Sequence, residues 1–511
     1  MADTILVVDC GGQYAHLIAR AIRKLHVHSE LAAAGVKASS LGPGVKGVII
    51  SGGPATVYEK DSPKPEKKLL ALGIPVLGIC YGHQYIAYAL DGKVGKAGKK
   101  EFGFTDLDVL NDKGILAGLG KKEKVWMSHG IEILLLPEGF QKIASTENCE
   151  IAAFEDARRK IFGIQFHAEV RHTKCGKRIL KNFVDICGCK KDWKAQNTVP
   201  AIIEGIRNEA GGKKAIVALS GGIDSSTAAM LCHKAIGKNL VAVYIDTGMM
   251  REGETRWIEE HFSKLDINLS VIDAKKDFLE ALRGITDPEE KRIAIGDTFV
   301  DVFAKQIETF GADYLIQGTI YPDRIESAQA SRSASKIKTH HNVGSPKIER
   351  MRMDGKVIEP LKDFYKDEVR AIARDIGLPQ PLIWRQPFPG PGLAARIEGE
   401  VTEEKLETVR HADKIVREEI EDASQEGKRP WQYFAVLSNS FATGVKGDER
   451  AFGHVVIVRV VESHEAMTAN FAKMSWDVLE RISTRITNEV PGITRVVYDI
   501  THKPPATIEW L

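Results

Sequence analysis

Short apolar segments alternate with amphipathic ones along the first 190 residues. Three apolar segments lie at residues 4–9, 47–51 and 76–80. Their unbroken runs are typical of strands that are buried on both faces of a parallel sheet. Residues 13–25 have the apolar spacing of a helix, and the pieces between 102 and 167 are short and strand-like. The pattern predicts a first domain at residues 1–189, built on a doubly wound α/β sheet.

A second block of the same kind follows the polar stretch around residues 187–197. Apolar segments recur at residues 215–219, 240–246, 268–273 and 313–319, with helical patterns between them. This alternation predicts a second doubly wound parallel sheet. We assign residues 196–388 to this second domain.

Proline and glycine interrupt the pattern at residues 378–396, which are too broken for a helix or a central strand. Beyond this stretch the chain mixes two helical patterns with three strand patterns. We expect helices at 402–423 and near 475–488, and strands at 433–438, 453–462 and 494–500. The predicted fold class is therefore α/β, with two doubly wound domains followed by a third, α+β domain at residues 389–511.

Composition excludes several classes of protein. Lysine and arginine number 71 against 69 acidic residues, so a net charge of +2 provides no basic field for nucleic acid. No apolar run reaches the ~20 residues of a membrane span, and the N-terminus enters a strand without a signal peptide. The seven cysteines show no framework spacing and no C-x-x-C pair. This usage favours a reducing cytoplasm over a disulfide scaffold or a cysteine-rich zinc site.

Cys80 stands where the strand at 76–80 meets a helical pattern, with Gly78 and Gly82 on either side. A helix N-terminus favours the thiolate, which is the nucleophilic form of cysteine. The flanking glycines would relieve the steric cost of a strained turn, as in the serine elbows of hydrolases. A buried structural cysteine is the alternative, so a nucleophile needs a base nearby.

The segment GIQFHAEV at 163–170 supplies a candidate base. His167 and Glu169 share one side of the predicted strand, where the carboxylate can orient the imidazole toward the cysteine proton. A surface histidine is the alternative, whereas a zinc deaminase would need a downstream P-C-x-x-C that is missing. The glycines of SGGP (51–54) leave N–H groups for an oxyanion or form an ordinary turn. We predict a Cys80–His167–Glu169 triad.

A second candidate site lies in the segment LSGGIDSS at 219–226, which follows an apolar strand and opens a helical pattern. Glycine amides, serine hydroxyls and a helix N-terminus form a cradle for a pyrophosphate. The segment is not a Walker A loop, because no G-x-x-x-x-G-K-[ST] occurs. The alternative is a turn in which Asp224 or Ser225 caps the helix. GPGVKG at 42–47 matches G-x-G-x-x-G but precedes a strand, so it is set aside.

Residues 1–189 resemble class I glutamine amidotransferases through SGGP, GICYGHQ, WMSHG and GIQFHAEV, in that order. The resemblance implies that Cys80 attacks the side-chain amide of glutamine and that ammonia is released. It also implies an oxyanion hole at Gly53 and Tyr81, and places near the glutamine Gln84, Ser128, His129 and Gly130. The sequence departs from the family in GHQ, where methionine is common, and in FHAEV, where proline usually follows the histidine.

SGGIDSS with a preceding strand resembles the PP-motif of ATP pyrophosphatases, which split ATP into AMP and pyrophosphate. The resemblance implies that the phosphates are bound by Ser220, Gly221, Gly222, Asp224, Ser225 and Ser226. Asp224 would also help to hold Mg²⁺, and Asp246 and Gly248 would receive the adenosine. NAD synthetases, argininosuccinate synthetases, tRNA-thiolating enzymes and GMP synthetases all carry this motif.

Four later segments are similar to glutamine-hydrolysing GMP synthetases, namely residues 318–328, 337–346, 385–396 and 498–511. This family implies synthesis of GMP from xanthosine monophosphate (XMP), ATP and glutamine with Mg²⁺ and no organic prosthetic group. It implies a homodimer through the third domain and XMP contacts from Lys503, Ile508 and Glu509. Lys338 is a candidate ATP ligand, and His340 and His341 are lid residues or simply exposed. Lys446 departs from the glutamine usual near the XMP site.

Two other readings stay open at this point. A PP-motif amidotransferase acting on a different acceptor, such as a tRNA base, would need a basic groove that the net charge does not indicate. A scaffold that has lost its chemistry would have eroded Cys80, His167, Glu169 or the SGGIDSS loop, and all of these are present. We therefore expect a cytoplasmic enzyme of small-molecule substrates, without nucleic-acid or membrane partners.

Overall fold

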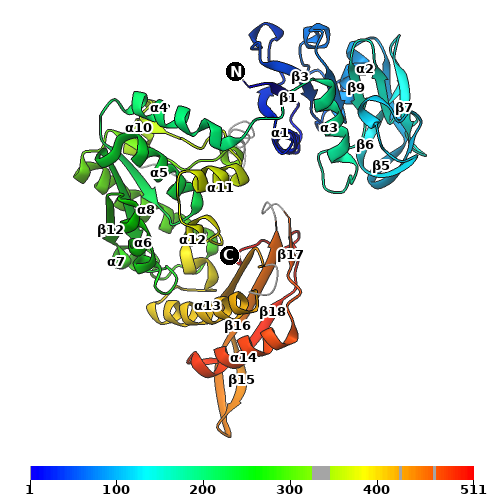
Figure 1. The fold of residues 1–511 in the computed structure, drawn as a ribbon. Helices are drawn as coiled ribbons and strands as arrows, with labels where there is room; N and C mark the ends of the chain where they lie inside the picture. The colour runs from blue at the N-terminus through cyan, green and yellow to red at the C-terminus, as the bar shows by residue number, and fades with distance from the viewer. Residues whose placement is uncertain (1, 325–345, 425–428, 464–467) are drawn as a thin grey trace. The chain divides into compact units, whose positions relative to one another are not determined.

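The computed structural model describes residues 2–324, 346–424, 429–463 and 468–511 (Figure 1). By its internal contacts the chain divides into two compact units, Met1–Asn197 and Thr198–Leu511. Each unit is described by itself. Lys338, His340 and His341 lie outside the described residues.

The first unit is built on a nine-stranded sheet in the order β2-β1-β3-β4-β9-β8-β7-β5-β6. The strands from β2 to β9 in this order pair in parallel, and the remaining ones pair antiparallel. The strands are β1 (Thr4–Asp9), β2 (His28–Ala33), β3 (Val45–Ile50), β4 (Val76–Ile79), β5 (Lys93–Val109), β6 (Lys122–Leu135), β7 (Gln141–Ser145), β8 (Ala153–Asp156) and β9 (Ile161–Ile164). The predicted parallel sheet is confirmed and carries an antiparallel extension.

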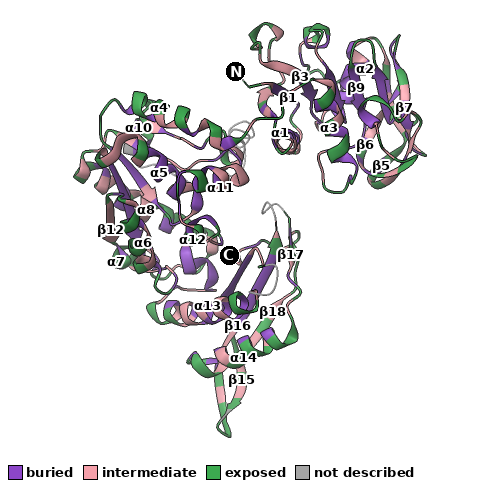
Figure 2. Cartoon of the chain, viewed as in Figure 1, coloured by how far each residue is buried: buried purple, intermediate pink, exposed green. Residues whose placement is uncertain are grey.

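Helices cover both faces of this sheet, as a doubly wound fold requires. They are α1 (Ala15–Arg23), α2 (Tyr81–Ala89) and α3 (Gly176–Ile186). Alternation along β1 sends Ile5 and Val7 into one core with α1 and α3, and Leu6 and Val8 into another with α2. Figure 2 shows how buried residues follow the strands of the sheet.

The second unit contains a five-stranded parallel sheet in the order β12-β11-β10-β13-β14. Its strands are β10 (Ala215–Leu219), β11 (Leu240–Asp246), β12 (Leu269–Asp273), β13 (Tyr314–Ile316) and β14 (Val357–Ile358). The accompanying helices are α4 (Val199–Ala210), α5 (Ile223–Ile236), α6 (Glu254–Phe262), α7 (Lys275–Ala281), α8 (Pro288–Phe310), α10 (Pro346–Met353), α11 (Lys366–Asp375) and α12 (Gln380–Ile383). The predicted second doubly wound sheet is confirmed.

The same unit ends in a smaller, mostly antiparallel sheet with two helices. These elements are α13 (Glu403–Ala423), β15 (Gln432–Lys446), β16 (Glu449–Ser463), β17 (Ala469–Phe471), α14 (Trp476–Glu489) and β18 (Ile493–Asp499). One apolar core contains Ile216 and Val243 of the parallel sheet together with Tyr433 and Val458 of this one. The boundary at 388/389 between a second and a third domain therefore stays a prediction.

Short 3₁₀ turns connect several elements, at Ala38–Ser40, Lys67–Ala71, Gly114–Leu116, Ala195–Thr198, Gly237–Asn239, Ser263–Leu265 and Gly392–Arg396. Among the described residues, no helix combines the length and the apolar character that a membrane crossing needs.

Candidate active sites

Cys80 occupies a strained turn between β4 and α2. Its backbone has φ +54° and ψ −105°, a conformation that costs a non-glycine residue about 1–3 kcal/mol. Only 7% of the residue is exposed. The turn places Cys80 at the start of α2, where helix N–H groups favour negative charge. Strain at a buried cysteine of this kind points to a functional role.

Gly78 and Gly82 differ from their predicted role. Neither has a positive φ, because the strain falls on Cys80 itself. Instead, both glycines permit close packing: a Cβ at Gly78 would overlap the Gly82 backbone, and a Cβ at Gly82 would overlap the Ile50 carbonyl. The two glycines therefore hold the first turn of α2 directly against β3 and β4.

The predicted base lies beside this cysteine. His167 Nδ1 is 2.6 Å from Glu169 Oε1, and the Glu169 side chain has no exposed surface. Burial alone would lower the pKa of His167, but the Glu169 carboxylate and Cys80 outweigh burial and raise it to about 11. The arrangement favours an imidazolium ring that is paired with Glu169 and lies beside the Cys80 sulfur.

The glycine loop after β3 lies against both Cys80 and His167. A Cβ on Gly52 would lie 3.2 Å from His167 Cε1 and 3.5 Å from Cys80 Cβ. Gly53 packs so tightly on the Cys10 carbonyl that no side chain fits there. Tyr81 is the first residue of α2, so its N–H has no partner within the helix. Tyr81 therefore directly follows Cys80, and Gly53 is the residue after the glycine that contacts it.

The segment of Ser128, His129 and Gly130 passes this site with its backbone rather than with the His129 ring. The Ser128 carbonyl lies 3.7 Å from Cys80 Sγ. The His129 side chain is buried, with Nδ1 3.0 Å from the Ile131 carbonyl and Nε2 3.2 Å from Glu101 Oε2. Gln84 is likewise buried, and its Nε2 donates to the Ile131 carbonyl at 2.9 Å.

Gln165 is a residue that the motif analysis missed. Its Nε2 lies 3.7 Å from Cys80 Sγ, a hydrogen-bonding distance for sulfur, and its Oε1 accepts from Gln84 at 3.0 Å. The predicted strand would have placed Gln165, His167 and Glu169 on one side, but β9 ends at Ile164 and all three residues follow it. Their spacing of two residues was the signal in the sequence.

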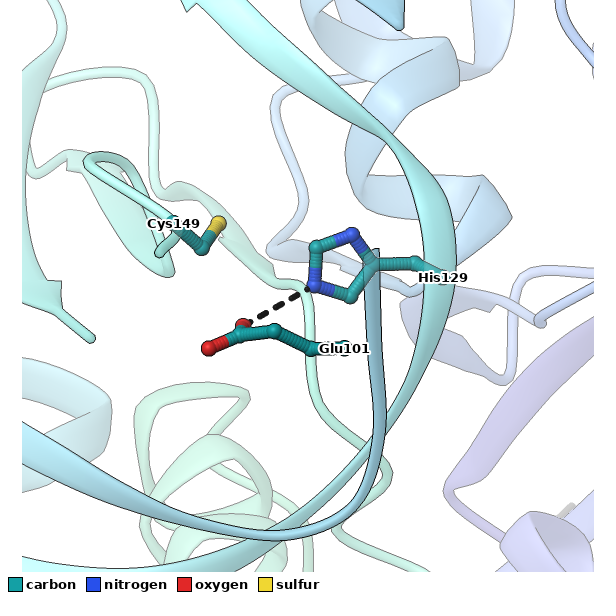
Figure 3. Close-up of side chains that lie close together, drawn as sticks. All are labelled: Glu101, His129 and Cys149. Carbon is teal, nitrogen blue, oxygen red and sulfur yellow. Dashed lines mark hydrogen bonds and ion pairs between the residues drawn. The ribbon is translucent and has the colours of Figure 1, made fainter. Parts of the chain in front are cut away.

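Among the described residues, one cluster has side chains of metal-binding types: Glu101, His129 and Cys149 (Figure 3). Their ligand atoms lie within 4.8 Å of one another and all three residues are buried. The Glu101 carboxylate already accepts hydrogen bonds from Thr146 and Asn148 as well as contacting His129. Burial also raises the pKa of Cys149 to about 12, so its thiol is protonated. The cluster is explained as a hydrogen-bonded network.

The loop of the second candidate site joins β10 to α5. Ser225 Oγ lies 3.1 Å from Ser220 Oγ and 3.2 Å from the Gly222 carbonyl, and Ser226 Oγ donates to that carbonyl at 2.8 Å. Gly221 has φ +71°, the left-handed region that favours glycine. The helix begins at Ile223 after Gly222, without a side-chain cap from Asp224 or Ser225. The loop opens at a helix N-terminus, the position where anions bind.

Two cations that sequence spacing could not connect reach this loop from distant parts of the chain. Lys366 pairs with Asp224, and Arg385 pairs with Glu254 and donates to the Gly221 carbonyl at 3.3 Å. The Arg385 guanidinium also lies over the Trp257 ring. The loop is therefore braced by positive charge on the side that faces α6 and α11.

Asp224 and Asp246 differ in their freedom to hold a metal. Asp224 Oδ1 is buried without a hydrogen-bond partner among the described residues. Asp246 is engaged instead by Thr255 Oγ1 at 2.8 Å, the Gly248 N–H at 3.0 Å and Lys275 at 3.3 Å. A carboxylate oxygen suits Mg²⁺, which takes one or two carboxylates and completes its shell with waters and phosphates. Asp224 fits that requirement.

The C-terminal tail is fixed by two buried arginines. Arg459, 1% exposed, pairs with Asp499 and donates to the carbonyls of Thr507 (2.6 Å) and Ile508 (2.8 Å). Arg396, fully buried, binds both oxygens of Glu509 at 3.1 Å.

These contacts restrict the predicted XMP ligands. The Ile508 side chain is buried in a small apolar cluster, and the Glu509 carboxylate is held by Arg396. The Lys503 backbone pairs with Ala469. The Lys446 side chain lies outside the described part of the chain. XMP contacts at these positions stay a prediction.

Comparison with known families follows the division of the chain. Residues 6–187 match the family described as "Glutamine amidotransferase class-I", residues 196–298 match "NAD synthase", and residues 418–510 match "GMP synthase C terminal domain". The NAD synthase match covers the β10–α5 loop and the strand after it.

Curated relatives extend over the full length. A protein of Aeropyrum pernix named "GMP synthase (glutamine-hydrolyzing)" is 49% identical over 510 residues, which covers 99% of this chain and 98% of the relative. A protein of Thermomicrobium roseum with the same name is 50% identical over 514 residues, covering 99% of this chain and 96% of the relative. A third, from Caldicellulosiruptor saccharolyticus, is 48% identical and covers 99% of both.

Proposed function

The chain belongs to the family of glutamine-hydrolysing GMP synthases, and we propose that it divides this reaction between its two doubly wound sheets. Its overall activity is glutamine-dependent GMP synthesis. The two other readings of the sequence, a tRNA-modifying enzyme and a scaffold, do not account for relatives of this name along the whole chain. What remains to be assigned is which residues perform each half.

In the first half, Cys80 attacks the side-chain amide of glutamine and forms a thioester. The observation that carries this assignment is the strained φ of +54° at Cys80, together with the buried His167–Glu169 pair beside it. His167 gives a proton to the amide nitrogen, which leaves as ammonia, and then takes one from the water that hydrolyses the thioester. The N–H groups of Gly53 and Tyr81 stabilise the oxyanion. Glu169 fixes the orientation of the ring.

In the second half, the β10–α5 loop binds the phosphates of ATP. An oxygen of XMP attacks the α-phosphorus, pyrophosphate leaves, and the O-adenylated XMP that forms has AMP as a good leaving group. Ammonia then displaces AMP and gives GMP. Positioning and charge stabilisation suffice for such transfers. Helix-terminal N–H groups, the serine hydroxyls and the nearby cations Lys366 and Arg385 provide both.

Mg²⁺ fits this site through the free Oδ1 of Asp224. When bound there with phosphate oxygens, it would neutralise charge on the pyrophosphate group. Lys366 pairs with the other oxygen of the same carboxylate and holds it at the mouth of the loop. Asp246 and Gly248, at the end of β11, would receive the adenosine.

The last sheet supports both XMP binding and a homodimer. Large apolar side chains are exposed on β15, β16, β18 and the residue after it: Phe441, Val445, Phe452, Val497 and Ile500. Exposed apolar surface of this kind fits a second copy of the chain. Lys503 and the backbone near Ile508 and Glu509 would contact XMP.

Free cysteines fit the reducing cytoplasm.

Product stoichiometry tests the proposed division. With XMP, ATP, Mg²⁺ and glutamine, each GMP should be accompanied by one glutamate, one AMP and one pyrophosphate. ADP and phosphate in place of AMP and pyrophosphate would refute the adenylation at the β10–α5 loop. Light scattering of the purified chain tests the homodimer separately.

A further inference from the structure

A continuous line of buried polar groups runs from Glu101 to the Cys80 sulfur. Glu101 Oε2 lies 3.2 Å from His129 Nε2 (Figure 3). His129 Nδ1 lies 3.0 Å from the Ile131 carbonyl. The same carbonyl accepts from Gln84 Nε2 at 2.9 Å. Gln84 Nε2 also lies 3.0 Å from Gln165 Oε1, and Gln165 Nε2 lies 3.7 Å from Cys80 Sγ.

This line fixes the direction of both amides. The Ile131 carbonyl can only accept hydrogen bonds, so the Gln84 atom beside it must be the NH₂ group. That NH₂ group then gives its second proton to Gln165, which must present its oxygen to Gln84. The Gln165 NH₂ group is consequently turned toward Cys80. The orientation of the Gln165 amide therefore follows from the hydrogen-bond network.

A hydrogen-bond donor beside the Cys80 sulfur would stabilise the thiolate form of this residue. A protonated Cys80 thiol can donate to the Ser128 carbonyl at 3.7 Å, but a thiolate cannot and would face that oxygen unfavourably. Gln165 is the side-chain amide that donates to the sulfur among the described residues. Because Gln165 is fully buried, its N–H is not weakened by competing water.

The far end of the line holds one shared proton. His129 Nδ1 faces a carbonyl and Nε2 faces a carboxylate, so both ring nitrogens meet acceptors. A proton must therefore lie between Nε2 and Glu101 Oε2, on either partner. Thr146 and Asn148 donate to the same carboxylate and keep it in place. In the strand pairing, Glu101 is opposite His129 at the point where the β5–β6 register shifts. The pair thus fixes β6 where its ladder is interrupted.

We propose that Gln165 is a catalytic residue of the glutaminase site, donating its amide N–H to the Cys80 thiolate, and that the Glu101–His129 pair positions it through Ile131 and Gln84. The inference rests on the proposed role of Cys80 as the nucleophile. It assigns to Gln165 a task separate from the proton transfers of His167 and from the backbone oxyanion donors.

Gln165→Glu is the sharpest test, because it keeps the oxygen that accepts from Gln84 and replaces the donor by an oxygen. We expect the glutamine-dependent kcat to fall about 10²-fold, the cost typical of one lost donor, while the KM for glutamine changes by less than about threefold. The rate of Cys80 alkylation by iodoacetamide at pH 7, followed on the Cys80 peptide by mass spectrometry, should fall at least about tenfold. Gln165→Leu provides a second variant without an added charge.

Two variants of Glu101 test whether the Glu101–His129 pair positions Gln165. Glu101→Ala should lower the glutamine-dependent kcat and the alkylation rate in parallel, about tenfold each. Glu101→Gln should restore most of that loss, because its amide can donate to a neutral His129 and still accept from Thr146 and Asn148. Gln141→Leu, an exposed glutamine on β7, is the matched control and should equal wild type.

Wild type and every variant are also assayed with ammonium in place of glutamine. If wild type itself makes no GMP from glutamine, the proposed function fails rather than this inference. A Gln165→Glu variant that alkylates at the wild-type rate overturns the role of Gln165. Equal losses in Glu101→Ala and Glu101→Gln overturn the shared-proton pair. One zinc ion per purified chain, lost in Glu101→Gln, would overturn it in favour of a metal at Glu101, His129 and Cys149.

Discussion

Replacing Gly82 by alanine tests how Cys80 is held in its strained turn. Gly82 lies in the first turn of α2, two residues after the nucleophile. A Cβ built there overlaps the Ile50 carbonyl oxygen and lies 2.8 Å from the carbonyl carbon, whereas real Cβ atoms stay beyond 3.0 Å. The obstacle is backbone of a central strand, so it cannot turn aside as a side chain could.

The size of the effect follows from this overlap. To relieve it, the start of α2 must move away from β3 by about 1 Å, and Cys80 and Tyr81 must move with it, a misplacement that costs about 10²-fold in rate. Overpacking of this kind costs about 1–3 kcal/mol of stability, which the helix propensity of alanine offsets by at most about 1 kcal/mol. The change should therefore damage catalysis much more than folding.

The assay measures GMP formation with glutamine and, separately, with ammonium. Gly82→Ala should lose about 10²-fold of the glutamine-dependent rate and keep the ammonium-dependent rate. Gly205→Ala in α4, where no atom lies within 4 Å of the added Cβ, is the matched control and should gain roughly 1 kcal/mol in stability with both rates intact. A Gly82→Ala variant with the wild-type glutamine rate would refute the close-packing account of the turn.

Three further changes probe the two units. Glu169→Gln should slow glutamine hydrolysis about 10²–10⁴-fold. The pKa of His167 is raised to about 11, so the stability that Glu169 contributes is present below about pH 6.5 and lost as the pH rises through 11. Urea unfolding should therefore separate the variant from wild type more at pH 6 than at pH 10. Burial lowers the pKa of His83 to about 3, so wild type should lose stability as the pH falls from about 6.5 toward 3. His83→Met should lose less stability over this range. Equal slopes of unfolding free energy against pH in the two proteins would contradict a buried neutral ring. Arg396→Met removes the arginine partner of Glu509 and one of three arginine partners of Asp413, beside Arg417 and Arg251. It should cost about 3–5 kcal/mol in calorimetric unfolding, while a loss below 1 kcal/mol would mean that water reaches Glu509.

Local sequence patterns predicted much of the fold and the close approach of Cys80 to His167. Continuous apolar segments located most strands of both parallel sheets but not β2 and β14. Burial on both faces leaves little freedom in composition, so such strands stand out in the sequence. The predicted triad lay within two short motifs. One contains Cys80 at the start of a helix, and the other contains His167 and Glu169, two residues apart. Partners close in sequence are the ones that spacing rules can predict.

Contacts between distant segments were not predictable in this way. Lys366 is 142 residues from Asp224, and Arg385 is 164 residues from Gly221. Gly82 was expected to relieve strain, but a Cβ is excluded at this position because the Ile50 backbone of another strand lies too close. Gln165 lay within a recognised motif, yet its importance depends on Gln84 and the Ile131 carbonyl.

Strand ends show a similar limit. Residues 433–438 were predicted as a strand, whereas β15 runs from Gln432 to Lys446. After the predicted end comes the polar stretch 438–440, where the pairing with β16 shifts register between Leu437 and Phe441 and then continues. An irregularity within a strand looks like a terminus in the sequence, because both interrupt the alternation.

The most direct measurement of the central claim compares wild type with Cys80→Ala in the presence of XMP, ATP and Mg²⁺, with glutamine or with ammonium as the nitrogen source. Two separate sites joined by ammonia predict that wild type uses both sources, and that Cys80→Ala loses the glutamine reaction and keeps the ammonium reaction. If Cys80→Ala still uses glutamine, or if wild type forms GMP from neither source, the assignment of the two half-reactions is contradicted.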